Sequence, residues 1–96
     1  MRFYVYILVS VRSGRTYTGQ SQDYVERLRR HNAGREKSTK AFGPWELAVL
    51  ITCNTRVEAI NIEMKLKKLK SRKLLFDHAF RSGGVAGPGW SEALLQ

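Results

Sequence analysis

Five side chains in this sequence carry the functional groups that phosphodiester hydrolysis requires. They are two tyrosines, an arginine, a histidine and a glutamate, at Tyr6, Tyr17, Arg27, His31 and Glu63. A carboxylate is an oxygen ligand for a hard divalent cation, and a guanidinium stabilises charge on a phosphoryl group. Phenols and imidazoles can position or deprotonate water. If the fold brings these groups together, they predict a hydrolytic site for phosphodiesters.

Each of these groups also has a purely structural interpretation. Two tyrosines on paired strands are usually cross-strand packing. Arg27 and His31 are four residues apart and share a helix face, but a helix that also carries Arg29 and Arg30 needs solvated charges. Glu63 stands in an apolar stretch, where a carboxylate must be exposed, paired or bound to a cation, and Lys67 at i+4 offers an ordinary ion pair.

The charge balance indicates a polyanionic partner. Lys and Arg number 17 against 8 Asp and Glu, which gives a formal net charge of +9. Because each neutralised phosphate releases condensed counterions, nucleic acid is the first candidate, although basic surfaces without that role also exist. The residues predicted to contact phosphate are Gly19, where the backbone permits close approach, and the cations Lys37, Lys40, Lys65, Lys67, Lys68, Arg72 and Lys73.

The elements that position these groups begin with a hairpin. Residues 3–9 are aromatic or aliphatic throughout and predict a central strand covered on both faces. Ser13-Gly14 is a turn signal, and residues 15–18 predict the partner strand, which ends at Gly19. A short helix follows, capped by Ser21 or Asp23 and ended by residues 32–34.

The remainder of the chain predicts one more strand and two more helices. Residues 35–42 are polar and basic and predict an exposed loop, and residues 45–52 alternate as a strand does. Thr55 and Glu58 form a capping box before the main core helix, and Ser71 can cap a last helix. The order ββαβαα predicts an α+β fold, a small α/β domain with a three-stranded, mainly antiparallel sheet flanked by helices.

The sequence predicts one domain over residues 1–81 and a glycine-rich, flexible C-terminal tail over 82–96. Trp90, Leu94 and Leu95 are the tail residues that could dock on the body or on a protein partner. No apolar run approaches the roughly 20 residues of a membrane span, and no secretion signal is recognised. With a single cysteine, Cys53, the chain is expected to be cytoplasmic.

Two motifs resemble those that give the GIY-YIG nuclease superfamily its name. Tyr4-Val5-Tyr6 is similar to the first motif, and Tyr17-Thr18-Gly19 is similar to the second. The segments 23–32 and 58–63 resemble the family's first helix and the helix that carries its metal-binding glutamate. The resemblance covers residues 3–75 and fits the small, free-standing, single-domain bacterial members of the family.

The resemblance implies a metal-dependent endonuclease that hydrolyses DNA phosphodiester bonds, in DNA repair or processing. It implies Arg27 as the catalytic arginine, Glu63 as the ligand of Mg²⁺ or Mn²⁺, and His31 as an assistant to Tyr6 and Tyr17. Products would carry 5′-phosphate and 3′-hydroxyl ends, and RNA fits the charge as well as DNA does. Gln20 stands where many relatives have lysine. The alternative is therefore a non-catalytic nucleic-acid-binding module on the nuclease scaffold.

Overall fold

Strand β1 (Phe3–Ser10) lies inside the sheet, as its apolar sequence predicted. The computed structural model describes residues 2–95. β1 pairs antiparallel with β2 (Thr16–Ser21) on one side and with β3 (Trp45–Cys53) on the other. Residues from Val5 to Ser10 are buried, because both faces of the sheet are covered. The α+β class and the antiparallel sheet are confirmed.

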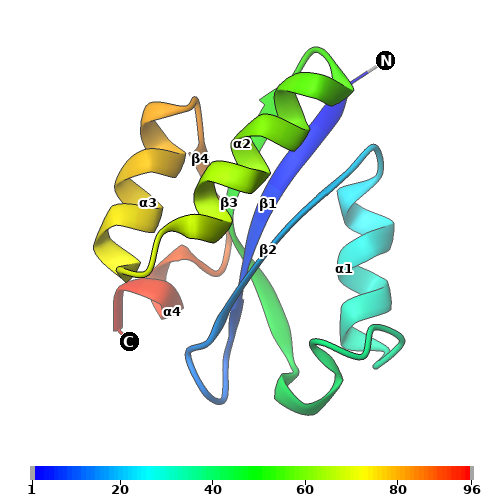
Figure 1. Ribbon diagram of the computed structural model, residues 1–96. Helices are drawn as coiled ribbons and strands as arrows, with labels where there is room; N and C mark the ends of the chain where they lie inside the picture. Colours follow the sequence, from blue (N-terminus) through cyan, green and yellow to red (C-terminus); the bar gives the residue numbers. More distant parts are fainter. Residues whose placement is uncertain (1, 96) are drawn as a thin grey trace.

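Helices cover the two faces of the sheet unequally (Figure 1). α2 (Arg56–Lys68), α3 (Arg72–Arg81) and α4 (Trp90–Leu95) pack on one face, and α1 (Tyr24–Asn32) packs on the other. Successive side chains of β1 point to opposite faces, so they divide between two cores. Val5, Ile7 and Val9 pack in the core under α2, α3 and α4, while Tyr6 and Leu8 belong to the core on the α1 side.

All three helix caps suggested by the sequence are present, and they fix where each helix begins. Asp23 Oδ1 accepts a hydrogen bond from the Glu26 N–H at 3.0 Å. Thr55 Oγ1 accepts from the Glu58 N–H at 3.1 Å, and Ser71 Oγ accepts from the Leu74 N–H at 3.3 Å. Such caps satisfy backbone donors that have no partner within the first turn of a helix.

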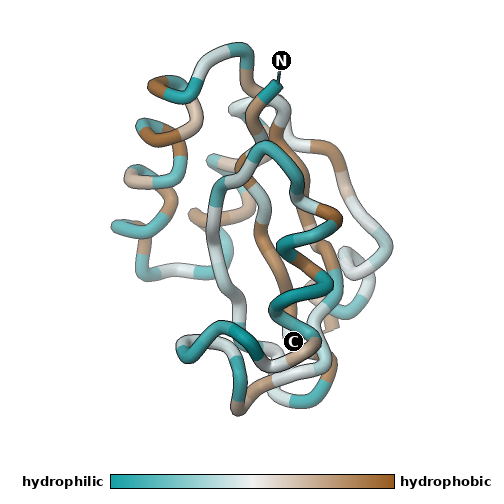
Figure 2. The backbone as a smooth tube through the Cα atoms, turned by 90° about the vertical axis from the view of Figure 1, so that its right-hand side faces the viewer, coloured by the Kyte–Doolittle hydropathy of each residue, from teal (hydrophilic) through white to brown (hydrophobic). Residues whose placement is uncertain are grey.

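The C-terminal end of α1 is tied to the start of β3. The side-chain amide of Asn32 donates to the Trp45 carbonyl at 3.0 Å and accepts from the Trp45 N–H at 2.6 Å. In Figure 2, which views the molecule from the side of α1, much of this helix is hydrophilic while the strands behind it are hydrophobic. The hydrogen bonds of Asn32 hold the inner face of α1 against the sheet. Two of the predicted site residues, Arg27 and His31, belong to this helix.

Helix α2 is less completely buried than its apolar sequence indicated. Ala59 and Leu66 are buried and Ile62 packs beside them, at the i, i+3, i+7 spacing of one helix face. Val57 and Met64 are 67% and 52% exposed. One stripe of α2 therefore faces the sheet, and Val57 and Met64 face solvent.

Regular structure continues beyond Arg81, where the sequence predicted a flexible tail. A fourth strand, β4 (Val85–Ala86), pairs with β3, so the sheet has four strands in the order β2-β1-β3-β4 instead of the expected three. Gly87 approaches β3 so closely that a Cβ there would lie 2.5 Å from the Leu47 carbonyl oxygen. Trp90, at the start of α4, then packs between the rings of Phe76 and Phe80. Docking of this segment on the body is confirmed for Trp90.

Within residues 2–95, no helix has both the length and the apolar character needed to span a membrane.

Candidate active site at the edge of the sheet

The two tyrosines of the predicted site lie on neighbouring strands and on one face of the sheet. Tyr6 of β1 pairs with Gly19 of β2, and Tyr17 stands two residues before Gly19. Residues two apart on a strand point the same way, so Tyr6 and Tyr17 are diagonal neighbours. Their ring centroids are 6.5 Å apart. β2 is an edge strand, so the pair lies at the rim of the sheet.

Gly19 is required by this tyrosine pair. A Cβ at position 19 would lie 2.6 Å from the Tyr6 hydroxyl oxygen and 3.1 Å from Cε2 of Tyr17. Any side chain would therefore have to displace Tyr6, which is only 1% exposed. The glycine itself is buried in β2, and its contact with nucleic acid stays a prediction.

His31 of α1 contacts both tyrosines. Its Nε2 lies 3.3 Å from the Tyr6 hydroxyl, and its ring centroid is 4.8 Å from that of Tyr17. Its Nδ1 lies 2.8 Å from Oγ1 of Thr39, and that hydroxyl donates to the Glu36 carbonyl at 3.4 Å. Because Thr39 gives its proton to the carbonyl, this network assigns the proton of His31 to Nδ1 and leaves Nε2 to accept from Tyr6.

Burial keeps both members of the Tyr6–His31 pair neutral. It raises the pKa of Tyr6 to about 12, against the opposing effect of the Arg27 charge. It lowers the pKa of His31, and the charges of Arg27 and Arg30 act in the same direction while Glu36 opposes them. Tyr6 is thus a hydrogen-bond donor at neutral pH and not a base. His31 is 1% exposed, so it acts on its surroundings through the tyrosines.

Arg27 lies one turn before His31 and reaches the same cluster. Its Nη2 is 3.7 Å from Oε1 of Glu36, whose carboxylate also lies 3.4 Å from Nε of Arg30. The Nε of Arg27 is buried and has no hydrogen-bond partner. The guanidinium charge acts on the Tyr6 hydroxyl, which places the two groups in one electrostatic environment. Arg27 therefore offers a free donor beside the tyrosines.

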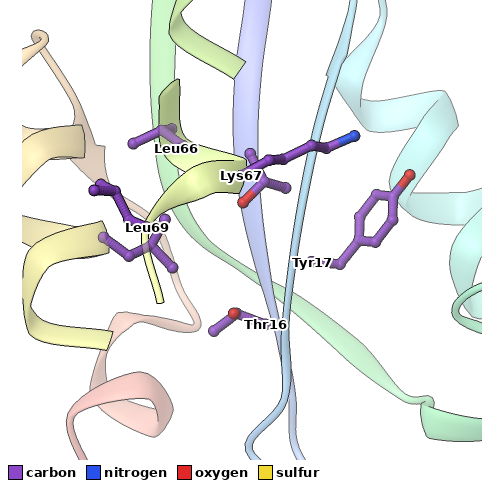
Figure 3. A pocket seen from close by; sticks show the side chains of 7 residues that line it. Thr16, Tyr17, Leu66, Lys67 and Leu69 are labelled. Carbon is purple, nitrogen blue, oxygen red and sulfur yellow. The ribbon is translucent and has the colours of Figure 1, made fainter. Parts of the chain in front are cut away.

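Glu63 reaches the cluster from α2, across the edge strand. Its side chain is 17% exposed, and Oε2 lies 3.1 Å from Nζ of Lys67. Figure 3 shows Lys67 extending across β2 toward the side on which the Tyr17 ring lies, and Nζ is 6.0 Å from the centroid of that ring. The ion pair that the sequence offered as the alternative for Glu63 is present. It stands, however, beside Tyr17, and the Glu63 charge acts on Tyr6.

The donor set suits one kind of metal ion. Among residues 2–95 there is no group of three or more His, Cys, Asp and Glu side chains that could hold a metal. Glu63 is a single hard oxygen ligand, which fits Mg²⁺ or Mn²⁺ because such ions keep several waters and take further ligands from substrate phosphates. It does not fit a zinc site, which needs three or four protein ligands.

The cations predicted to contact phosphate lie in two places. Lys37 is exposed in the loop after α1, and Lys40 is exposed at the start of a short 3-10 helix, η1 (Lys40–Phe42). The second group follows α2 into α3, where the four lysines are exposed and the arginine is partly buried: Lys65, Lys67, Lys68, Arg72 and Lys73. Both groups follow the tyrosines and His31 in the chain, and the second group begins two residues after Glu63.

Comparison with known proteins identifies the domain. The family model described as the GIY-YIG catalytic domain matches residues 2–75, which hold the whole cluster. The chain belongs to the GIY-YIG family. This places it in a nuclease superfamily, for which the substrate is nucleic acid.

Two comparisons with one bacterial GIY-YIG relative agree with this assignment. The chain is 35% identical to UPF0213 protein BH0048 of Halalkalibacterium halodurans over 74 residues, which are 76% of this chain and 78% of that protein. The solution NMR structure of BH0048, recorded as from Bacillus halodurans, covers 100% of this chain and 98% of its own, with 30% identity and a TM-score of 0.53. The resemblance to a small, free-standing group is thereby confirmed.

Two residues of this GIY-YIG cluster were not predicted from the sequence to belong to it. Thr39 is 1% exposed although it lies in the segment predicted as an exposed loop. Glu36 faces Arg27 and Arg30 from the same segment. Both stand outside any periodic pattern, so only the path of the loop back over α1 reveals them. The one available signal was an acid among the cations of residues 35–40.

Proposed function

We propose that this GIY-YIG chain is a metal-dependent endonuclease that hydrolyses phosphodiester bonds in DNA. The observation that carries the proposal is the meeting of Tyr6, Tyr17 and Arg27 with Glu63 of α2 at the outer edge of β2. Two phenols, a guanidinium and a carboxylate converge there from four different elements. A module that only binds a polyanion has no use for a carboxylate in that position.

Arg27 would stabilise the charge that develops on the phosphate. When water attacks phosphorus and the bond to the 3′ oxygen breaks, negative charge grows on the phosphoryl oxygens. The buried, unpartnered Nε of Arg27 is a donor already fixed in place, and such preorganised donors are most effective where charge develops. The 3′ oxygen would leave with the bonding electron pair and take a proton from solvent, so the products would carry 5′-phosphate and 3′-hydroxyl ends.

Tyr17 would position the attacking water through a hydrogen bond to its phenol oxygen. Of the two tyrosines it is the more exposed, whereas Tyr6 is buried and holds its proton with a pKa of about 12. His31 packs against Tyr17 and accepts the hydrogen bond of Tyr6, so it orients both rings without touching substrate. Tyr6, Tyr17 and His31 thus have different roles in the proposal.

Glu63 is the residue that would hold the divalent cation. When bound, Mg²⁺ or Mn²⁺ would supply Lewis-acid stabilisation of the phosphoryl oxygens. Nζ of Lys67 pairs with the Glu63 carboxylate at 3.1 Å. The metal ion and the lysine would therefore compete for this carboxylate. Binding of DNA offers the displaced ammonium a phosphate to pair with, which couples substrate binding to metal binding.

The proposal is tested by incubating the purified protein with supercoiled, branched and single-stranded DNA in Mg²⁺, in Mn²⁺ and in chelator. We expect cleavage that requires the metal and yields ends that a DNA ligase accepts. Glu63→Gln should abolish cleavage and leave DNA binding unchanged or tighter, because it removes both the metal ligand and a negative charge near phosphate. Glu92→Gln, on α4, is the matched control.

The rival is a nucleic-acid-binding module that keeps this scaffold without turnover. It predicts tight, salt-dependent binding to the same DNA molecules and no cleavage with any metal. Cleavage that continues undiminished in Glu63→Gln would instead retain the enzyme and remove Glu63 from its site.

A further inference from the structure

Two buried side-chain donors in the described part of the chain have no hydrogen-bond partner, and both belong to arginines. One is the Nε of Arg27, which the proposed reaction uses, and the other is Nη1 of Arg72. A buried charged donor left unpaired is costly. Arg72 stands at the start of α3, outside the cluster around Tyr6, so its free donor needs a separate explanation.

The guanidinium of Arg72 is held in a fixed position. Its Nη2 donates to the backbone carbonyl of Gly14, in the turn between β1 and β2. Its central carbon lies 5.8 Å from the centroid of the Phe76 ring. One nitrogen of the planar group therefore joins α3 to the hairpin, and another, Nη1, is buried without a partner. A guanidinium anchored in this way loses little further freedom when it binds an anion.

A groove runs from Tyr17 to Arg72 along the outer edge of β2. It consists of two hollows, of about 280 Å³ and 270 Å³, that share Thr16, Leu69 and Leu75 in their walls. Figure 3 shows the first, with Tyr17 and Lys67 at one end and Thr16 and Leu69 at the other. We call the two hollows together the β2-edge groove. Each has room for several water molecules, at roughly 30 Å³ apiece.

The lining of the β2-edge groove is cationic at the rim and apolar within. Its charged residues are all basic: Arg15, Lys67, Lys70 and Arg72. No carboxylate lines either hollow among the described residues. Thr16 and Thr18 add hydroxyl groups along the strand. This chemistry suits a phosphodiester chain, which presents anionic oxygens at intervals along a less polar backbone.

We propose that the β2-edge groove binds the nucleic-acid strand at a phosphate next to the scissile one, with Arg72 as its anchoring ligand. The proposal rests on the proposed function, because Tyr17 forms one end of the groove. Tyr17 and Lys67 line the first hollow, and Arg15, Lys70 and Arg72 line the second. A nucleic-acid strand that leaves Tyr17 along this edge would therefore meet Lys67 first and Lys70 and Arg72 next.

The test is a scan with oligonucleotides of one sequence in which a single phosphate is replaced by a neutral methylphosphonate. Affinity is measured by fluorescence anisotropy in chelator, so that no cleavage occurs. In the wild type, we expect one position beside the scissile phosphate to lose about tenfold in affinity, the scale of a hydrogen bond to a charged group. Arg72→Gln should bind the unmodified strand about tenfold more weakly and lose its sensitivity to that one position.

Two further variants keep the test independent of folding. Because Arg72 also contacts the Gly14 carbonyl, Arg72→Gln could unfold the protein, and circular dichroism detects this. Lys70→Gln removes an exposed side chain from the same groove and should reduce sensitivity at the same position. Arg81→Gln, at the other end of α3, is the matched control and should behave as wild type.

The outcomes separate this proposal from the nuclease. Equal methylphosphonate losses in wild type and in Lys70→Gln and Arg72→Gln would overturn the subsite, even if the protein cleaves DNA. If Lys70→Gln and Arg72→Gln lose sensitivity to one methylphosphonate position but the protein cleaves no DNA, the subsite is supported and the endonuclease proposal is weakened. A second result would also overturn the proposal: no position in the methylphosphonate scan alters affinity, and polyglutamate competes for the protein as strongly as DNA does. That result would assign the groove to an acidic protein.

Discussion

The Tyr6 hydroxyl donates to Nε2 of His31 over 3.3 Å, in a place where both residues are 1% exposed. The hydrogen bond joins the central strand to α1, and Thr39 completes it at Nδ1 of the histidine. A buried hydrogen bond of this kind needs the imidazole to be neutral, because a protonated ring would present a donor to the Tyr6 proton. The candidate site and the stability of the fold therefore depend on the same protonation state.

This predicts that the protein loses stability as the pH falls below the ordinary pKa of histidine. Burial lowers the pKa of His31 in the folded state, so the unfolded chain takes up its proton first. The stabilisation is present above about pH 6.5 and declines below it, down to the lowered pKa. Urea midpoints measured between neutral and mildly acidic pH check this. His31→Gln should show a shallower slope, with His78→Gln as the matched control.

Two outcomes decide between the histidines. A slope that persists in His31→Gln but disappears in His78→Gln would assign the titration to α3 and contradict the neutral Tyr6–His31 pair. Thr39→Val, which removes the acceptor at Nδ1, should lower the midpoint at all pH values.

Gly19→Ala should damage the site through Tyr6. The new methyl group would lie 2.6 Å from the Tyr6 hydroxyl oxygen, and the buried phenol cannot move without breaking its bond to His31. Overpacking of this kind costs about 1–3 kcal/mol. We expect a lower melting temperature and a loss of cleavage. At Gly43 a Cβ would make only ordinary contacts with Trp45, from 3.7 Å, so Gly43→Ala is the control. Unchanged stability in Gly19→Ala would contradict this prediction, because it would show that the Tyr6 side chain can adopt another conformation without cost.

Lys67→Gln should strengthen metal binding to the free protein. The lysine neutralises Glu63 at 3.1 Å, and its removal leaves the carboxylate unpaired and available to Mn²⁺. Calorimetric titration without DNA should show tighter Mn²⁺ binding than in wild type. Lys68→Gln removes a neighbouring lysine that does not pair with Glu63 and should leave the affinity unchanged. Weaker Mn²⁺ binding in Lys67→Gln would mean that the lysine supports the ion instead of competing with it.

The parts of the fold that the sequence predicted well depend on local signals. Asp23, Thr55 and Ser71 cap their helices because a short polar side chain satisfies a free N–H three residues on, whatever the rest of the molecule does. The continuous apolar run of β1 likewise predicts a strand covered on both faces. The site residues on these elements could therefore be placed before the structure was known.

The parts that were missed depend on contacts between distant segments. β4 has two residues among glycines, and it is a strand only because Val85 and Ala86 pair with β3. Thr39 is buried only because its loop folds back over His31, more than a turn of helix away in sequence. The hydrogen bond between Arg72 and the Gly14 carbonyl likewise joins segments that are 58 residues apart in the chain. No pattern within a short window predicts such pairings.

We propose that Arg27 acts in the chemical step, and single-turnover cleavage of DNA in Mg²⁺ tests this proposal most directly. Arg27→Ala should slow cleavage by about 10²-fold or more, the scale of losing one preorganised donor, with little change in DNA affinity. Arg29→Ala, on the exposed side of the same helix, should cleave at the wild-type rate. If the wild type cleaves no DNA structure with Mg²⁺ or Mn²⁺, and Arg27→Ala and Arg27→Lys differ from it only in affinity, the nuclease assignment is contradicted and the binding module stands.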